Sequence, residues 1–357
     1  MENNKSNAIQ THPALIFASL IIIIAGLMNA VSMVNAILMG LFLSIICAQP
    51  IAWLQTKKVP NTVALVIVLV GITAVFFFFI EVIGSSLSSF SENVDEYESN
   101  LKEMGSVMLN SLNSHGFHIS FSKISNLIDV SKAMNITANL LAGLGNLMGN
   151  ALTIFFLTVF LLLEVDSIAV KTKVAFNNSK KSGSYINTIV KNIRHYLTIK
   201  TVTSLLTGAL VWICLMIIGV DYAIIWALVA FLLNYIPNFG SIIAAIPAVL
   251  FSAIQLGFGG ALWTTIVFVS VNMIIGNVVE PKIMGKGLGL STYVVFVSLL
   301  FWGFILGTVG MFLSVPLTMA LKIMLEQSPK TKWIAIFLGS EEEAKAMFKK
   351  KNEIENL

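Results

Sequence analysis

A run of 34 residues without a single charge, from Ala14 to Cys47, constrains the fold of this chain more than any other feature. A membrane-spanning helix needs about 20 mainly apolar residues, so the run is too long for one comfortable span. The polar residues Asn29, Ser32 and Asn35 lie near its middle. We therefore predict two short membrane spans joined by a tight polar turn.

Further apolar stretches recur along most of the sequence. Charged residues make up only 11% of the chain, against about 25% in soluble proteins. This composition predicts an all-α, polytopic helical membrane protein with about eight spans, for which membrane lipid is a partner. Beyond the first two, the spans are predicted at Thr62–Ile80, Leu140–Leu163, Thr201–Gly219, Leu262–Val279 and Thr292–Leu321, the last long enough for one tilted span or two short ones.

The stretch from Thr201 to Val279 is apolar but repeatedly interrupted by glycine, proline and asparagine. Two pieces of it, Ala223–Tyr235 and Ile242–Leu256, are short for full spans, because proline removes a backbone donor and glycine weakens a helix. We interpret them as a broken helix or a re-entrant pair of half-helices. Non-helical backbone at membrane depth is tolerated only inside protein or along a watery cavity, so the pattern favours a transport path.

The predicted path and gate consist of residues that interrupt this half of the chain. They are Asn234, Pro237, Asn238, Gly240, Pro247, Asn272, Gly307, Gly310 and Pro316. Such residues suit a path for a small polar, uncharged solute, or for a cation coordinated through carbonyl oxygens. The alternative is structural: glycines that allow close packing, tolerated kinks, and asparagines that hydrogen-bond between helices.

Ionisable residues are costly within a bilayer and are therefore functional candidates. Glu81, Glu164, Asp221 and Glu280 each lie close to a predicted span end. Asp221 and Glu280 flank the interrupted region, and we predict that they couple transport to an ion or a proton. The argument against this role is their position, since a side chain at a span end reaches the interface at little cost.

The distribution of lysine and arginine predicts the orientation, because these residues concentrate on the cytoplasmic side of membrane proteins. Basic residues follow the second, fourth and last spans, whereas the segment from Glu81 to Leu140 is acidic. Both termini are then cytoplasmic. The chain divides into N-terminal membrane spans (1–83), an extracytoplasmic amphipathic helical segment (84–139), a span with a basic cytoplasmic interfacial helix (140–200), a transport core with broken helices (201–327) and a charged cytoplasmic tail (328–357).

Two amphipathic segments lie outside the predicted spans. On the outer side we predict a helix with an apolar stripe that makes oligomer contacts, although so short a run is equally compatible with a helix lying on the chain's own outer surface. On the inner side, Tyr185–Leu197 carries its apolar residues on one face and forms the predicted interfacial helix. The outer stripe consists of Phe90, Val94, Tyr97, Leu101, Met104 and Met108, at alternating spacings of four and three.

Sequence signatures of enzymes are missing. The sequence has no GxSxG, HExxH or P-loop motif, no metal-spaced histidine and cysteine cluster, and no basic stripe with interleaved aromatic residues. Cys47 and Cys214 lie in apolar runs, where packing is a more ordinary role than a disulfide. We predict a protein that is not an enzyme and has no cofactor, metal or nucleic-acid partner. The missing P-loop argues against an ATP-driven pump.

Three blocks of the sequence closely resemble the signature blocks of the bacterial autoinducer-2 exporter family. They are Asn234–Pro247 (NYIPNFGSIIAAIP), Val279–Ser291 (VEPKIMGKGLGLS) and Leu300–Leu317 (LFWGFILGTVGMFLSVPL), and their order matches the family. The layout is similar over nearly the whole chain, but the resemblance does not extend to the details of the Glu81 to Leu140 segment. It implies an oligomeric, pentameric multi-pass transporter of the bacterial inner membrane, which exports the quorum-sensing furanone autoinducer-2 or exchanges sodium or lithium for protons.

The residues are compatible with three functions. The first is a secondary transporter or facilitator that exports a small polar solute such as autoinducer-2. The second is a sodium(lithium)/proton antiporter, in which Asp221 or Glu280 alternates between a proton and a cation. The third is an oligomeric membrane scaffold that assembles without moving a solute.

Overall fold

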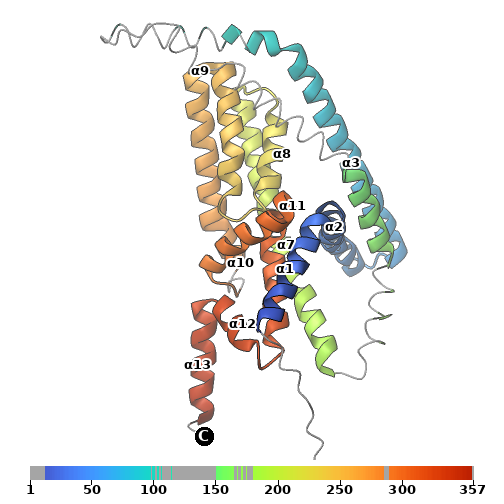
Figure 1. Cartoon of the computed structure of the whole chain (residues 1–357). Helices are drawn as coiled ribbons and strands as arrows, with labels where there is room; N and C mark the ends of the chain where they lie inside the picture. Colours follow the sequence, from blue (N-terminus) through green and yellow to red (C-terminus); the bar gives the residue numbers. More distant parts are fainter. Residues whose placement is uncertain are drawn as a thin grey trace, which may run out of the picture.

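The computed structural model describes residues 13–97, 99–100, 103, 106, 114, 150–164, 167, 170–171, 174, 180–284 and 289–355. Within these ranges every regular element is a helix, which confirms the all-α class (Figure 1). The helices are α1 (Pro13–Asn29), α2 (Val31–Thr56), α3 (Asn61–Glu92), an unlabelled helix (Asn150–Glu164), α7 (Lys180–Ile218), α8 (Ala223–Leu233), α9 (Gly240–Ile274), the π-helix η1 (Ile275–Val279), α10 (Glu280–Met284), α11 (Thr292–Glu326), α12 (Lys332–Leu338) and α13 (Glu341–Glu355).

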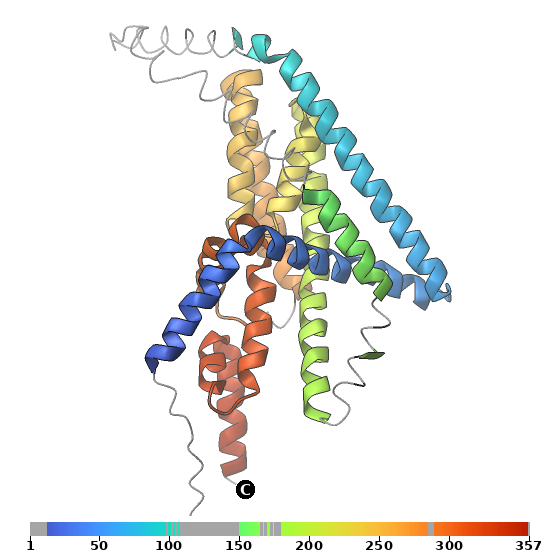
Figure 2. The ribbon, with the colours of Figure 1, turned by 45° about the vertical axis from the view of Figure 1, so that its right-hand side comes forward.

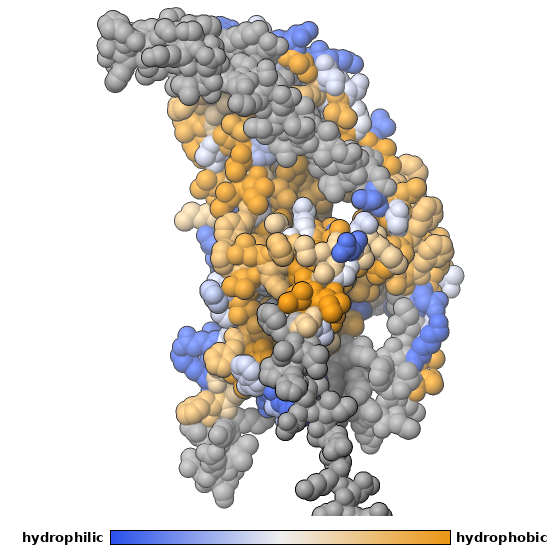
Figure 3. Space-filling model, in the orientation of Figure 1, coloured by the Kyte–Doolittle hydropathy of each residue, from blue (hydrophilic) through white to orange (hydrophobic). Residues whose placement is uncertain are grey.

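Five stretches are long and apolar enough to cross a membrane, which confirms the polytopic membrane class. They are Val31–Thr56, Asn61–Glu92, Thr188–Ile218, Gly240–Met284 and Thr292–Glu326. Large apolar side chains remain exposed along these helices, and they colour most of the visible surface in Figure 3 orange. Lipid tails are as apolar as leucine, so such a surface is stable in a bilayer.

The N-terminal apolar run forms two helices, as predicted, and the chain breaks between Asn29 and Val31. The side-chain amide of Asn29 donates to the carbonyl of Ala25 in its own helix (2.8 Å), which satisfies one carbonyl at the end of α1. α2 then continues through Pro50 to Thr56, so it is longer than the short span expected. Figure 2 shows α1 and α2 leaving this break in different directions.

The predicted interfacial helix at Tyr185–Leu197 and the following span form one continuous helix in the structure. α7 has 39 residues and runs from Lys180 to Ile218 without a break. Its length is about 58 Å, well beyond the roughly 30 Å of a bilayer core. No proline or glycine separates Leu197 from Thr201, and for this reason the helix continues unbroken between the two segments.

α9 and α11 are helical hairpins. The sequence predicted separate elements before and after residues 257–261, and either one tilted span or two short ones for Thr292–Leu321; the structure shows that each region folds into a hairpin. Each contains one glycine with non-helical backbone angles: Gly257 in α9 (φ 71°, ψ −162°) and Gly307 in α11 (φ 64°, ψ −146°). The Thr264 hydroxyl donates to the Ser252 hydroxyl at 2.9 Å, although 12 residues along a straight helix would separate them by about 18 Å. The two arms of α9 therefore lie side by side, and Figures 1 and 2 show this hairpin above α11.

Two apolar clusters hold the C-terminal half together. The first surrounds Trp226 of α8 and Phe251 of α9, which are almost completely buried. The second surrounds Tyr196 of α7 and Tyr235, the residue that follows α8, and it reaches α2 through Phe42. The two clusters fix α7, α8 and the α9 hairpin against one another, and the polar site described below lies among these elements.

Candidate functional site

A polar cavity of about 180 Å³ lies between α7, the connection from α8 to α9, and the end of the α9 hairpin with η1. Asn238 and Asn277 are exposed, which places an opening of the cavity on that side. A polar cavity among apolar, membrane-spanning helices is the feature that a transport path requires. Its lining consists of Lys200, Asn234, Ile236, Pro237, Asn238, Ser241, Asn272, Gly276, Asn277 and Glu280.

The connection from α8 to α9 owes its shape to three residues of the predicted path. Pro237 has no backbone N–H to continue α8, and Asn238 adopts a left-handed conformation (φ 62°), which asparagine tolerates better than most residues. A side chain at Gly240 would collide with the carbonyl of Leu233, so only glycine fits where α9 begins. The connection is thus held close to α8, and it forms one wall of the cavity.

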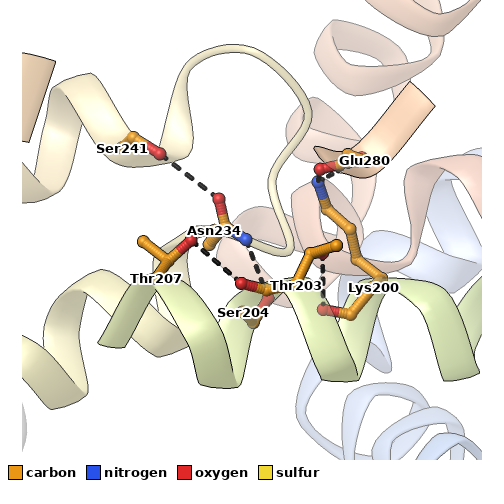
Figure 4. A network of polar contacts seen from close by, with 7 residues as sticks. All are labelled: Lys200, Thr203, Ser204, Thr207, Asn234, Ser241 and Glu280. Atoms are coloured by element: carbon orange, nitrogen blue, oxygen red, sulfur yellow. Dashed lines mark hydrogen bonds and ion pairs between the residues drawn. The ribbon is translucent and has the colours of Figure 1, made fainter. Parts of the chain in front are cut away.

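Asn234 is buried and joins three helices through its side-chain amide (Figure 4). Its Nδ2 donates to the Ser204 hydroxyl on α7 (3.0 Å), and its Oδ1 accepts a hydrogen bond from the Ser241 hydroxyl on α9 (3.3 Å). Buried amides without partners are costly, so these two bonds stabilise the close approach of the three helices. Asn234 is therefore primarily a structural member of the cavity wall.

An ion pair between Lys200 of α7 and Glu280 of α10 lies at one end of the cavity. The Lys200 ammonium is 2.8 and 3.0 Å from the two carboxylate oxygens of Glu280, and the side chains are only 6% and 18% exposed. Each charge compensates the other, and removal of one partner would leave an uncompensated charge in a poorly hydrated place. The pair links the middle of α7 to the helix that follows η1.

The π-helix η1 places Gly276 and Asn277 on the cavity wall, directly before Glu280. A π-helical turn accommodates one more residue than an α-helical turn and occurs frequently at functional sites. Asn272 lies one turn earlier, in the second arm of α9, and lines the same cavity. The end of the α9 hairpin therefore supplies two amides and the carboxylate from consecutive turns.

The structure brings together some of the predicted path residues and separates others. Asn234, Pro237, Asn238 and Asn272 line the cavity with Glu280, and Gly240 adjoins it. The remaining four do not line it: Pro247 is buried within the first arm of α9, and Gly307, Gly310 and Pro316 belong to the α11 hairpin. Pro247 and Pro316 both lie within continuous helix. Contrary to the prediction, neither proline interrupts the backbone.

Glu280 lies beside the middle of α7 and Asp221 lies beyond its C-terminal end, so the two do not share a site. Glu280 pairs with Lys200, whereas Asp221 follows the end of α7, about 27 Å further along its axis. The Tyr97 hydroxyl donates to the Asp221 carboxylate (3.0 Å), and the Asp221 backbone N–H donates to Gln255 (2.8 Å). Burial, together with hydrogen bonds to Tyr222 and Asp221, raises the pKa of the Tyr97 phenol.

The described part of the outer heptad stripe packs within the protomer, so Phe90 and Tyr97 offer almost no free surface for oligomer contacts. Phe90 and Tyr97 are each 3% exposed and stack on one another, and Tyr97 also contacts Phe251 of α9. Val94 packs against the same cluster. The apolar face is covered by the chain's own helices, which was the alternative interpretation. Leu101, Met104 and Met108 lie outside the described residues.

Sequence reasoning missed Lys200, Ser204 and Ser241. Lys200 was assigned to a basic cytoplasmic segment, because it adjoins Lys191 and Arg194. The available signal was a polar stripe on α7: Lys200, Thr203, Ser204 and Thr207 recur at helical spacing, and all four are buried (Figure 4). In the described part of the chain, no group of three or more histidine, cysteine, aspartate or glutamate side chains is arranged to hold a metal ion.

Comparison with known proteins gives consistent matches over most of the chain. Residues 17–330 match the model of a family described as "AI-2E family transporter". A Haemophilus influenzae protein named "Putative transport protein" is 40% identical over 352 residues, which cover 97% of this chain and 100% of that protein. The "AI-2 transport protein TqsA" of Escherichia coli K12 is 34% identical over 325 residues, which cover 91% of this chain and 94% of that protein.

Proposed function

The chain belongs to the AI-2E transporter family, and from this premise we propose that it exports a small, polar, uncharged solute through the cavity beside Lys200 and Glu280. Transport across a membrane is the function of the family. The finer assignment, export of an autoinducer-2-like furanone, is our proposal. The observation that carries it is the cavity itself, a polar space enclosed by apolar helices.

The chemistry of the lining favours an uncharged solute. Lys200 and Glu280 neutralise each other, so the cavity holds charged groups but little net charge. Asn238, Asn272 and Asn277 present amides, which both donate to and accept from hydroxyl and carbonyl groups. A furanone with several hydroxyl groups matches such a lining, whereas a bare cation would have to displace the ammonium of Lys200.

Efflux of the furanone from proteoliposomes tests this function. We expect Asn272→Leu and Asn277→Leu each to lower the efflux rate about tenfold, because each removes hydrogen-bonding groups from the path. The matched control is Asn29→Leu, which changes an exposed asparagine that bonds to its own helix, outside the cavity. Absence of flux through the wild-type protein, with and without an ion gradient, would contradict the proposal.

Antiport of sodium or lithium against protons is the second candidate, and Glu280 is the observation that favours it. A carboxylate on the wall of a membrane-embedded cavity is the group that such exchange needs. The double variant Lys200→Met with Glu280→Gln separates the two functions, because it removes both charges together. Facilitated export predicts furanone efflux within about threefold of wild type in the double variant, and about tenfold loss in Glu280→Gln alone. Antiport predicts that both variants lose ion exchange.

The membrane setting and assembly are further parts of the proposal. We propose a location in the bacterial inner membrane with both termini in the cytoplasm, supported by the basic residues that follow the spans. We also propose a homo-oligomer, a pentamer by family resemblance, with Leu101, Met104 and Met108 as contacts. Leu101→Asp combined with Met104→Asp should dissociate it, as measured by native mass. A polar cavity disfavours the alternative of a scaffold that moves no solute.

A further inference from the structure

Lys322, in the second arm of α11, is a buried lysine outside the cavity with partners on three different elements. Its side chain is 7% exposed. The ammonium donates to the carbonyl of Gly289 (2.7 Å), which precedes α11, and to the carboxylate of Glu343 (2.5 Å) on α13. Glu326, one turn along α11, is more distant at 3.5 Å. A lysine placed in this way connects three segments, because its ammonium has three donors and a full charge.

The same place is closed by backbone contacts. The Ser291 N–H donates to the carbonyl of Leu338 at the end of α12 (3.1 Å). Gly289 has φ 66°, and a side chain there would lie 3.4 Å from the Lys322 ammonium. A side chain at Gly339 would lie 2.9 Å from the Glu343 carboxylate. The C-terminal end of α12 and the first turn of α13 therefore hold the segment Gly289–Ser291, and Lys322 lies at the centre of these contacts. We call this set of contacts the clamp.

This segment leads directly to a wall of the cavity. Ser291 is the N-cap residue of α11, so its position sets where the first arm begins. Phe296, just over one turn into that arm, packs on Phe239 with ring centroids 5.7 Å apart. Phe239 follows Asn238, which lines the cavity. A continuous chain of contacts thus connects Glu343 and Lys322 with the connection from α8 to α9.

We propose that Lys322 and Glu343 are positioning residues for transport: they hold Gly289–Ser291, and through it the first arm of α11, against the cavity wall. The charged C-terminal helix α13 then contributes to transport by holding this segment in place. The effect on flux rests on the proposed function, whereas the mechanical connection does not. In transport, loss of the contact lowers the maximal rate and leaves the solute KM unchanged, because neither residue touches the cavity.

The mechanical connection is tested in the purified full-length protein. Variants Lys322→Met and Glu343→Gln are compared with Glu326→Gln, a matched control that removes a carboxylate only 3.5 Å from the same ammonium. The first readout is tryptic cleavage of α13 at Lys345 and at the lysine run Lys349–Lys351. The second is alkylation of Asn238→Cys by a maleimide, with Cys47 and Cys214 replaced by serine. We expect both rates to rise about fivefold in the two test variants and to stay within about twofold in the control.

Transport measurements then test the coupling. We expect Lys322→Met and Glu343→Gln to lower the maximal efflux rate about tenfold with KM within about twofold, and the double variant to be no slower than Lys322→Met. Unchanged proteolysis and alkylation in the test variants, or equal changes in Glu326→Gln, would overturn the clamp. Altered alkylation with a wild-type efflux rate would overturn its role in transport. If the wild-type protein moves no furanone, this result contradicts the proposed function. The alkylation rates still show whether the clamp is present.

Discussion

The hairpins α9 and α11 share one sequence pattern, two glycines three residues apart, yet of these two hairpins only α9 lines the polar cavity. In each hairpin the chain reverses at a glycine in a backbone region that is essentially restricted to glycine, Gly257 or Gly307. In each, a second glycine follows three residues later, Gly260 or Gly310, where a side chain would collide with the first arm. The pattern Gly-x-x-Gly therefore builds a hairpin in both places.

The hairpins differ in what holds their tips and what they face. At the tip of α9, Gln255 bonds to the backbone of Gly219 and Asp221, in the connection from α7 to α8. At the tip of α11, the amide of Asn35 in α2 donates to the carbonyl of Leu306 (3.0 Å). α9 lines the cavity together with the polar stripe of α7, whereas α11 packs against the apolar cluster around Tyr196 of α7 and against α2 and α12. Glycine spacing therefore specifies that a hairpin forms, whereas the helices against which the hairpin packs determine whether it lines the cavity.

The largest expected effect on stability distinguishes Gly310 from Gly260, the second glycine of each hairpin. Gly310→Ala should lower the free energy of unfolding by about 3 kcal/mol or more, because the new methyl group collides with the backbone carbonyl of Trp302. Gly260→Ala should cost less, about 1–3 kcal/mol, because it meets the side chains of Leu256 and Ser252 as well as one carbonyl. Unfolding in detergent micelles measures both, and the reverse order would break the comparison.

A smaller effect is expected at the tips. Asn35→Leu should cost about 1 kcal/mol, because the part-buried carbonyl of Leu306 loses its side-chain donor. Gln255→Leu should cost no more than about 0.5 kcal/mol, since its hydrogen bonds are exposed and water can replace them. The same unfolding measurement applies. Equal losses would show that both tips are held with similar strength.

The smallest effect concerns the hydrogen bonds between arms. Thr264→Val in α9 removes a bond to Ser252, and Thr318→Val in α11 removes a bond from the Trp302 indole (3.0 Å). We expect about 0.6 kcal/mol for each, the average for such bonds in membrane proteins. Double-mutant cycles with Ser252→Ala and Trp302→Phe measure the coupling. A coupling above about 2 kcal/mol in either hairpin would show that its arms depend on this bond rather than on packing.

Much of the fold followed from the sequence because bilayers impose simple local rules. Apolar length predicted a polytopic helical membrane protein, and clustered glycine predicted interruptions near Gly257 and Gly307, where the structure shows that the chain reverses. Asn234 and Asn238, on either side of Pro237, line one cavity, because a helix break concentrates polar residues along a short stretch. The packing partner of the outer stripe was harder to predict, since the spacing of Phe90 and Tyr97 is compatible with an oligomer contact and with an intramolecular contact alike.

The sequence by itself determined the membrane class, the interruptions of the apolar stretches and the family, because each rests on local composition or on motifs read in order. Only the tertiary structure decided which polar residues meet. Lys200 and Glu280 are 80 positions apart, and Lys322 and Glu343 are 21 positions apart, on helices with α12 between them. Such pairs form because a buried charge must find its counter-charge, and the packing of α7, α9, α11 and α13 alone determines which one lies within reach.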